Sequence, residues 1–236
     1  MNDDVKIDIL DMEGKLIQSL PGTKRKGINK IYWNQRMKPS KVAEGGTKLD
    51  FGAFGAPKVL PGNYQVKLIV GNSSYIDTIK LVHTDRPDFS LADRKLQYDL
   101  NMKFYYMHEQ LARTVSAISN QQKTILELKT KMKNKKHIAQ ADSYYKALED
   151  LRSNLLATKQ KSIFADEEKL RERISDAYSN VVWEELKPSN LIIERAAILQ
   201  KEVDKSEMDL QLIQTKYQSK FDKTIKQEKI IRPIKS

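Results

Sequence analysis

Three histidines are the side chains of this 236-residue chain best suited to proton transfer or metal binding near neutral pH, because imidazole titrates there. They are His83, His108 and His137, and they are scattered over a strand end, a helical segment and a lysine-rich loop. None has a second histidine or a paired carboxylate at the spacing that metal ligands require. We therefore expect neither a metal site nor a histidine base.

One acidic segment weakly resembles a calcium-binding loop. Asp8, Asp11 and Glu13 precede Gly14. A calcium loop of the EF-hand type needs oxygen ligands at alternate positions and a glutamate at position 12, and this segment has neither. The pattern predicts an ordinary hairpin turn.

Other patterns that support catalysis are also incomplete. The acidic pairs Glu167-Glu168 and Glu184-Glu185 are neighbours in predicted helices, so their carboxylates point in different directions. Glycosidases instead place two carboxylates on opposite sides of a sugar. The glycines at 45–46, 52 and 55 do not lie between a strand and a helix, as a phosphate-binding loop requires. With no cysteine for thiolate chemistry, the sequence predicts no catalytic, cofactor-binding or metal-binding residue.

Positive charge is the one compositional sign of a partner. Lys and Arg number 42 against 31 Asp and Glu, for a net charge of +11. The excess concentrates at residues 131–136 and beyond residue 216. Solvated helix ends explain such lysines, and an anionic partner (nucleic acid, lipid head group or acidic polysaccharide) is the alternative. Because nucleic-acid sites usually combine arginine with aromatic residues, we do not expect nucleic acid to be the partner.

Aromatic residues on predicted helices have two interpretations. Tyr105-Tyr106, Tyr144-Tyr145 and Trp183 would suit stacking against sugars, or would contribute to an apolar core. We favour the core, with one tyrosine of each pair buried and the other exposed.

No apolar run approaches the roughly 20 residues needed to cross a bilayer. Residues 1–10 also lack the pattern of a signal peptide.

The first third of the chain has the alternating pattern of half-buried strands, bounded by Gly, Pro and Asn turns. All nine glycines occur at or before Gly71. At least five short strands are expected, and they favour a small β-sandwich. The segments that show the pattern are 5–9, 15–20, 28–33, 64–70 and 75–82. We expect Trp33 in the core and a turn at Pro61-Gly62. Arg36 is expected to pair with a carboxylate or with carbonyls of the long loop that contains the glycines at 45–46, 52 and 55.

Beyond residue 90 the apolar spacing changes to three and four, which is typical of helices. Ser90 is expected to cap a first helix, with an inward stripe from Leu96 to Met132. A second helix is expected at 138–159, with Tyr145 inward. A third is expected from 166–168 through residue 186, ended by Pro188. Ser189 caps the last, whose 4-3-4-3 spacing from residue 192 to 217 resembles a coiled-coil seam.

These patterns predict an α+β multidomain chain. The expected order is a β-sandwich (1–84), which the resemblance given next makes immunoglobulin-like, a linker (85–90), an elongated antiparallel four-helix bundle (91–229) and a basic tail (230–236).

A series of short motifs carries a resemblance to a known family. In chain order they are Val5-x-Ile7-x-Ile9, Asp11-x-x-Gly14-Lys15, Gly27-Ile28-Asn29-x-x-x-Trp33-Asn34-x-Arg36, Gly55-Ala56-Pro57-x-Val59-x-Pro61-Gly62-x-Tyr64-x-Val66-x-Leu68, Asp85-Arg86, Ser90-x-Ala92-Asp93, Leu170-x-x-x-Ile174-x-x-x-Tyr178-x-x-Val181 and Lys187-Pro188-Ser189. Together they resemble the C-terminal region of large exported bacterial proteins that begin with a sortilin-like, BNR-repeat β-propeller and are often labelled glycosyl hydrolases. The family usually has aspartate and glycine where this chain has Asn34 and Ala56.

The resemblance implies an immunoglobulin-like domain of the flagellar hook-capping (FlgD-like) type followed by a helical region. It also implies a periplasmic, cell-surface or secreted location. The propeller that would carry any hydrolytic or ligand-binding role is not in this chain, so the enzyme label does not transfer.

We therefore expect a non-catalytic structural and interaction module. Its partner would be the propeller of the parent protein or another envelope protein. The alternative is a module that binds an anionic polymer or glycan through lysine-rich bundle ends, and a third hypothesis, part of a glycoside hydrolase, depends only on the family's label.

Overall fold

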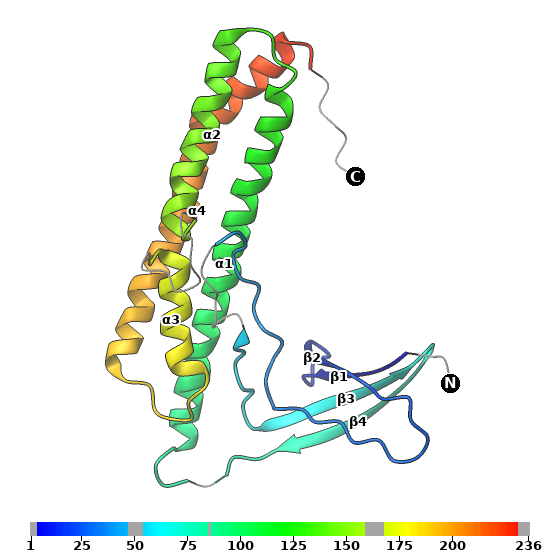
Figure 1. The fold of residues 1–236 in the computed structure, drawn as a ribbon. Helices are drawn as coiled ribbons and strands as arrows, with labels where there is room; N and C mark the ends of the chain where they lie inside the picture. The colour runs from blue at the N-terminus through cyan, green and yellow to red at the C-terminus, as the bar shows by residue number, and fades with distance from the viewer. Residues whose placement is uncertain (1–3, 47–53, 85, 159–167, 231–236) are drawn as a thin grey trace.

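A four-stranded antiparallel sheet and four helices make up the described part of the chain, so the α+β class is confirmed. The computed structural model describes residues 4–46, 54–84, 86–158 and 168–230. We call the residues up to 84 the sheet half and those from 86 onward the helical half. The helices form a long rod, and the sheet projects sideways from one end of it (Figure 1).

The sheet has the strand order β2-β1-β3-β4. Its strands are β1 (Val5–Leu10), β2 (Leu16–Pro21), β3 (Gly62–Val70) and β4 (Ser73–Leu81). The turn between β1 and β2 forms because the Asp11 carboxylate accepts hydrogen bonds from the backbone N–H groups of Glu13 and Lys15, at 3.0 and 2.8 Å. This Asx-type turn, with Gly14 at φ 84°, confirms the predicted hairpin turn.

The prediction of a strand at 28–33 is wrong. Ile28 is fully exposed, and Gly27 before it has φ 95°. The Asn29 side chain donates to the carbonyl oxygens of Arg25 and Gly27, at 3.0 and 2.9 Å. Such local hydrogen bonds compete with a strand ladder, so alternation alone did not produce a strand. The described residues thus form four strands, one fewer than the minimum expected.

Irregular segments cover part of one face of the sheet. Ile9, Ile17 and Tyr64 form a core with Val59, and Trp33 and Met37 pack against it. The Trp33 and Tyr64 rings meet edge to face at 5.7 Å. Trp33 therefore contributes to the core of the sheet half, as predicted, although its segment is not a strand.

The helical half contains α1 (Leu91–Lys129), α2 (Lys135–Leu155), α3 (Leu170–Val182) and α4 (Asn190–Gln227). Ser90 and Asp93 form the predicted capping box. Ser189 caps α4 as predicted, with its hydroxyl oxygen 3.5 Å from the Ile192 N–H nitrogen.

The boundaries of two helices differ from the prediction. Helix α2 begins at Lys135 rather than 138, because the Asn134 side chain accepts from the Lys136 N–H at 2.9 Å. Helix α3 begins at Leu170 and ends at Val182, so Glu168 precedes it and residue 186 lies beyond it. Helix α2 ends at Leu155 rather than 159, and residues 159 and 166–167, which the predicted boundaries include, lie outside the described residues.

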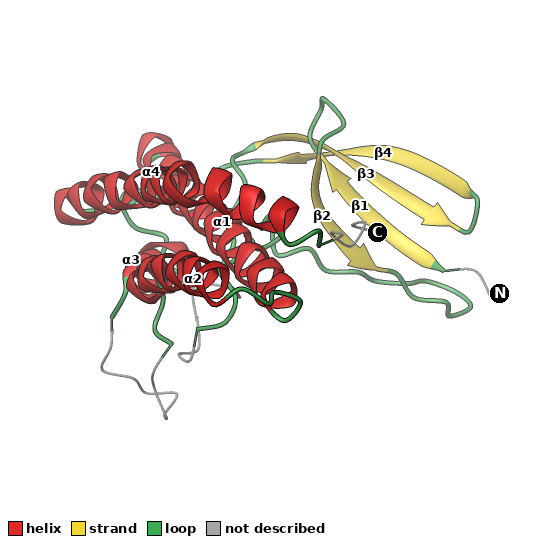
Figure 2. Ribbon diagram, turned by 90° about the horizontal axis from the view of Figure 1, so that it is seen from above, coloured by secondary structure: helices red, strands yellow, loops and turns green. Residues whose placement is uncertain are grey.

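Helices α2 and α3 follow one another along the lengths of α1 and α4 (Figure 1), and the sheet lies to one side of them (Figure 2). The helices enclose one elongated apolar core. The predicted stripe of α1 is buried from Leu100 to Met132, whereas Leu96 is exposed. On α2, Tyr144 is fully buried, and Tyr145, predicted to point inward, packs partly buried against the core.

Candidate interaction sites at the junction and the helical tip

Arg36 connects the two halves of the molecule. Its guanidinium donates to the carbonyl oxygen of Ala56 at 2.6 Å and to that of Val182 at 2.8 Å. It also lies over the ring of Trp183, 5.0 Å from the ring centre. The predicted pairing with a carbonyl of the long loop is confirmed, and a contact with the end of α3 is added to it.

Arg94 and Gln97 extend this junction from the first turns of α1, and both are buried. Arg94 donates to the carbonyl oxygen of Val59 at 2.9 Å and to the side-chain oxygen of Gln97 at 3.0 Å. Gln97 in turn donates to the carbonyl oxygen of Glu184. Burial lowers the pKa of Arg36 and of Arg94 from the ordinary arginine value. That value is so high that both guanidinium groups stay charged at physiological pH.

These donors explain why α3 stops at Val182. The last carbonyl groups of a helix have no partner within it. Here the carbonyl of Val182 is bound by Arg36 from the sheet half, and that of Glu184 just beyond the helix is bound by Gln97 from α1. Side-chain donors from other elements therefore bind carbonyl groups that N–H groups of a further helical turn would otherwise bind.

A small pocket of about 100 Å³ lies at the same junction. Lys58, Arg86 and Arg94 line it, together with Glu185. Glu185 forms ion pairs with Lys58 and, at 3.4 Å, with Arg86. The hydrogen bond from Lys58 is the main reason that the pKa of Glu185 is lowered. The carboxylate thus acts as an ionic link between the halves.

A second connection lies further along the rod. Ala43, in an irregular segment of the sheet half, is buried in the core of the helices. Arg171 of α3 donates to the Ala43 carbonyl oxygen at 3.1 Å, and Arg152 of α2 lies 3.4 Å from the Gly45 carbonyl oxygen. These contacts therefore connect the sheet half to the helices at a second place along the rod.

The three histidines lie in separate environments. His83 contacts the carbonyl oxygen of Phe89 at 3.1 Å, His108 is buried beside the ring of Tyr178, and His137 lies 2.7 Å from the Glu228 carboxylate. Across residues 4–46, 54–84, 86–158 and 168–230, no group of three His, Cys, Asp or Glu side chains is placed to hold a metal ion.

The first tyrosine pair is divided as predicted, whereas in the second the inward residue is Tyr144 rather than Tyr145, and neither tyrosine is fully exposed. Tyr105 and Tyr144 are buried, Tyr106 is exposed and Tyr145 is half-buried. Trp183 is 49% exposed, with one face under Arg36. The helices thus use Tyr105 of the first pair and both tyrosines of the second for packing.

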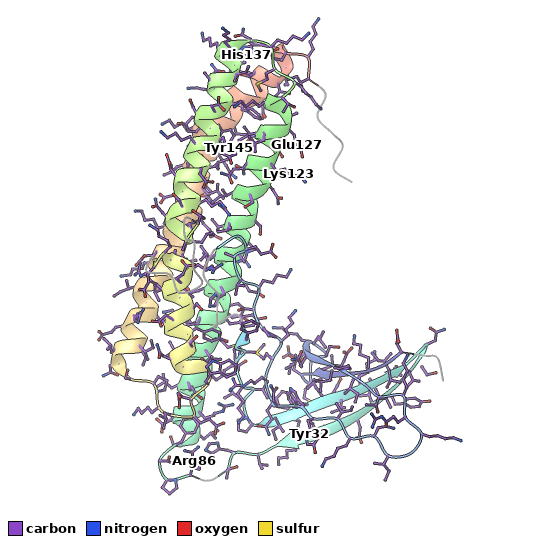
Figure 3. All side chains as sticks on the ribbon, in the orientation of Figure 1. Tyr32, Arg86, Lys123, Glu127, His137 and Tyr145 are labelled. Carbon is purple, nitrogen blue, oxygen red and sulfur yellow. The ribbon has the colours of Figure 1, made fainter. Side chains whose placement is uncertain are left out.

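The far end of the rod brings the two lysine-rich segments together. Figure 3 shows His137 at this end and Arg86 at the opposite end, where the chain passes from the sheet to α1. The Glu228 carboxylate, just after α4, accepts from the N–H groups of Lys133 and Asn134 at 3.3 and 3.1 Å. It therefore ties the end of α4 to the loop between α1 and α2.

Strand β4 is exposed along most of its length and lies at one edge of the sheet. Tyr75, Ile76 and Ile79 are large apolar side chains exposed on it. Tyr75 and Ile79 point to one face of the strand and Ile76 to the other, because successive side chains of a strand alternate between its faces. An exposed edge with apolar residues is typical of a strand that pairs with another chain.

Sequence reasoning found Arg36 but missed its partners. Arg94 and Gln97 lie among other polar residues of a long helix, and Glu185 resembled a solvated helix carboxylate. Nothing in their local spacing distinguishes them. Glu228 lies among the lysines of the C-terminal segment, and nothing in its spacing distinguishes it either.

No helix within the described residues is long and apolar enough to span a membrane. No family model, no curated protein and no solved structure matches this chain.

Proposed function

We propose that this chain is a non-catalytic structural and interaction module that holds a β-domain at a fixed angle to a helical rod. The junction carries this proposal. Arg36, Arg94 and Gln97 are engaged with backbone carbonyl oxygens, and Glu185 is engaged with two cations. Charged groups used in this way stabilise an arrangement of elements, and they are not left free for proton transfer.

In this proposal the β-domain is an immunoglobulin-like sandwich of the FlgD-like type. The four-stranded sheet is its first layer. Irregular segments around Trp33 and Val59 supply the second, joined by the short antiparallel bridge between Arg36 and Lys58. The four helices form an elongated antiparallel bundle in which α2 and α3 share one side.

The partner we propose is a larger protein of the cell envelope, in the first place the β-propeller of the parent protein to which the sequence motifs point. Strand β4 is the surface through which it binds. Val70 and Ser73 flank a two-residue hairpin turn, so the odd-numbered residues of β4 bond to β3 and the even-numbered ones direct backbone groups outward. A strand added at this edge would gain main-chain hydrogen bonds and contacts with the exposed apolar side chains.

Site-specific photo-cross-linking in the native cell tests this proposal. A photoreactive phenylalanine analogue at Tyr75 of β4 is expected to cross-link to a propeller protein. The same analogue at Leu212, an exposed apolar position on α4, is the matched control and is expected to give no such product. Equal products from both positions would contradict binding through β4. Hydrolysis of a glycoside by the purified chain, lost on substitution of one carboxylate, would contradict a non-catalytic role.

A further inference from the structure

The end of the rod far from the sheet carries a dense group of lysines, which we call the basic tip. It contains seven exposed lysines from two segments about 90 residues apart in sequence. These are Lys131, Lys133, Lys135, Lys136, Lys223, Lys226 and Lys229. Figure 1 shows the end of α4 beside the loop that joins α1 to α2.

Acidic residues do not neutralise this tip. Residues 129–137 and 220–230 contain nine lysines and only two acids, Asp222 and Glu228. Glu228 is turned inward, its side chain only 11% exposed, and it binds His137 and the loop backbone. Lys129 pairs with Asp142, but within the described residues none of the seven tip lysines forms an ion pair.

Helix energetics do not account for all of these lysines. Cations are favourable at the C-terminal ends of α1 and α4. Lys135 and Lys136, however, lie in the first turn of α2, which contains no acidic residue. There they oppose the helix dipole, so they weaken the helix that they begin. A negatively charged partner at the tip would reverse this unfavourable contribution.

We propose that the basic tip binds end-on to the surface of an anionic lipid bilayer. The cations are all lysines, which act as point charges without the planar geometry that arginine uses for specific phosphates. The nearby aromatic side chains Tyr144 and Phe221 are buried, so they cannot stack on bases. The two lysine segments lie beside one another at the end of the rod (Figure 1), so one flat charged surface can contact both at once. This inference is independent of the proposed protein partner.

Co-sedimentation with lipid vesicles tests the proposal. The whole chain is expected to bind vesicles with about 30 mol % phosphatidylglycerol at about 150 mM salt, and not to bind pure phosphatidylcholine vesicles. Replacing Lys133, Lys135 and Lys136 by glutamine is expected to weaken binding roughly fivefold per lysine, or about a hundredfold in total. Inorganic phosphate at about 10 mM is expected not to displace the protein, because binding needs many charges on one surface.

The matched control removes the same charge from the side of the rod. Lys146, Lys201 and Lys205 are exposed on α2 and α4, and their replacement by glutamine is expected to change binding less than about threefold. Equal losses in both triple variants, or no binding to anionic vesicles, would overturn the proposal. Tighter binding to heparin or to a single-stranded oligonucleotide at the same salt would also overturn it, in favour of an anionic polymer. Circular dichroism verifies that each variant remains folded.

Discussion

The guanidinium of Arg36 lies 2.8 Å from the carbonyl oxygen of Val182, the last residue of α3. The two residues are 146 positions apart in sequence. One side chain of the sheet half therefore caps a helix of the rod, while its second hydrogen bond holds the Ala56 segment of its own half. These two hydrogen bonds of Arg36 therefore hold the sheet half at a fixed angle to the rod in our proposal.

Replacing Arg36 by alanine is expected to destabilise the whole chain by about 2–4 kcal/mol, because two carbonyl groups lose a charged donor. Arg36→Lys should recover only part of this loss, since an ammonium group lacks the planar guanidinium that lies over the Trp183 ring while one of its nitrogens donates to both carbonyl oxygens. Urea unfolding measures the effect. Arg25→Ala, which removes an exposed arginine of the same half, should change stability by less than about 0.5 kcal/mol. Equal effects of Arg36→Ala and Arg25→Ala would contradict the role of the junction.

Glu185 is expected to make stability depend on acidic pH. Its pKa is lowered in the folded state, chiefly by the hydrogen bond from Lys58, so its contribution is present above the ordinary glutamate pKa and is lost as pH falls through the folded value. Glu185→Gln should cost about 1 kcal/mol at pH 7 and less at about pH 3, where the carboxylate is more often protonated. Unfolding midpoints at both pH values measure this, with the exposed neighbour substitution Glu184→Gln as control. A constant difference between wild type and Glu185→Gln at both pH values would contradict the ionic link.

Glu228 is expected to hold the loop between α1 and α2 in place. Its pKa is lowered mainly by the hydrogen bond with His137, so protonation below the ordinary glutamate pKa should release the loop. Glu228→Gln should raise the amide hydrogen-exchange rates of Lys133 and Asn134 at pH 7, since a neutral amide is a weaker acceptor. Glu127→Gln, on an exposed face of α1, should leave both rates unchanged. Unchanged amide exchange rates of Lys133 and Asn134 in Glu228→Gln would show that other contacts hold the loop between α1 and α2 in place.

Tyr144 is expected to titrate late among the tyrosines. Burial is the main reason that its pKa is raised to about 12, and the negative charge of Asp222 adds to the effect. The difference between absorbance titrations of the wild type and Tyr144→Phe should therefore show a step near pH 12. The substitution should also cost about 1 kcal/mol, because the hydroxyl lies 2.9 Å from the side-chain oxygens of Gln121 and Gln218. A difference step near pH 10, the ordinary tyrosine pKa, would mean that the Tyr144 hydroxyl is exposed to water.

Local signals in the sequence predicted local structure well. Alternation bounded by turn residues identified four strands, and Ser90 and Ser189 marked the start of two helices. The same alternation failed at Ile28, where the side chain of Asn29 binds the backbone within its own loop. Alternation gives the direction of side chains and does not supply the neighbouring strand that a ladder needs.

The interaction sites depend on contacts distant in sequence, so local patterns could not predict them. The end of α3 depends on Arg36 and Gln97, and the joining of the two lysine segments depends on Glu228. Charge counting identified both lysine segments, but it did not place Lys135 and Lys136 at the start of a helix. In our proposal, that position is the reason to favour a partner-binding surface over solvated helix ends.

A distance measurement between the halves tests the central claim most directly. The chain has no cysteine, so spin labels attach only at introduced positions, for example Thr78→Cys on β4 and Gln211→Cys on α4. Double electron–electron resonance is expected to give one narrow distance distribution for this pair. Adding Arg36→Ala and Glu185→Gln should broaden it. A broad distribution in the protein that retains both residues would contradict a fixed angle between sheet and rod.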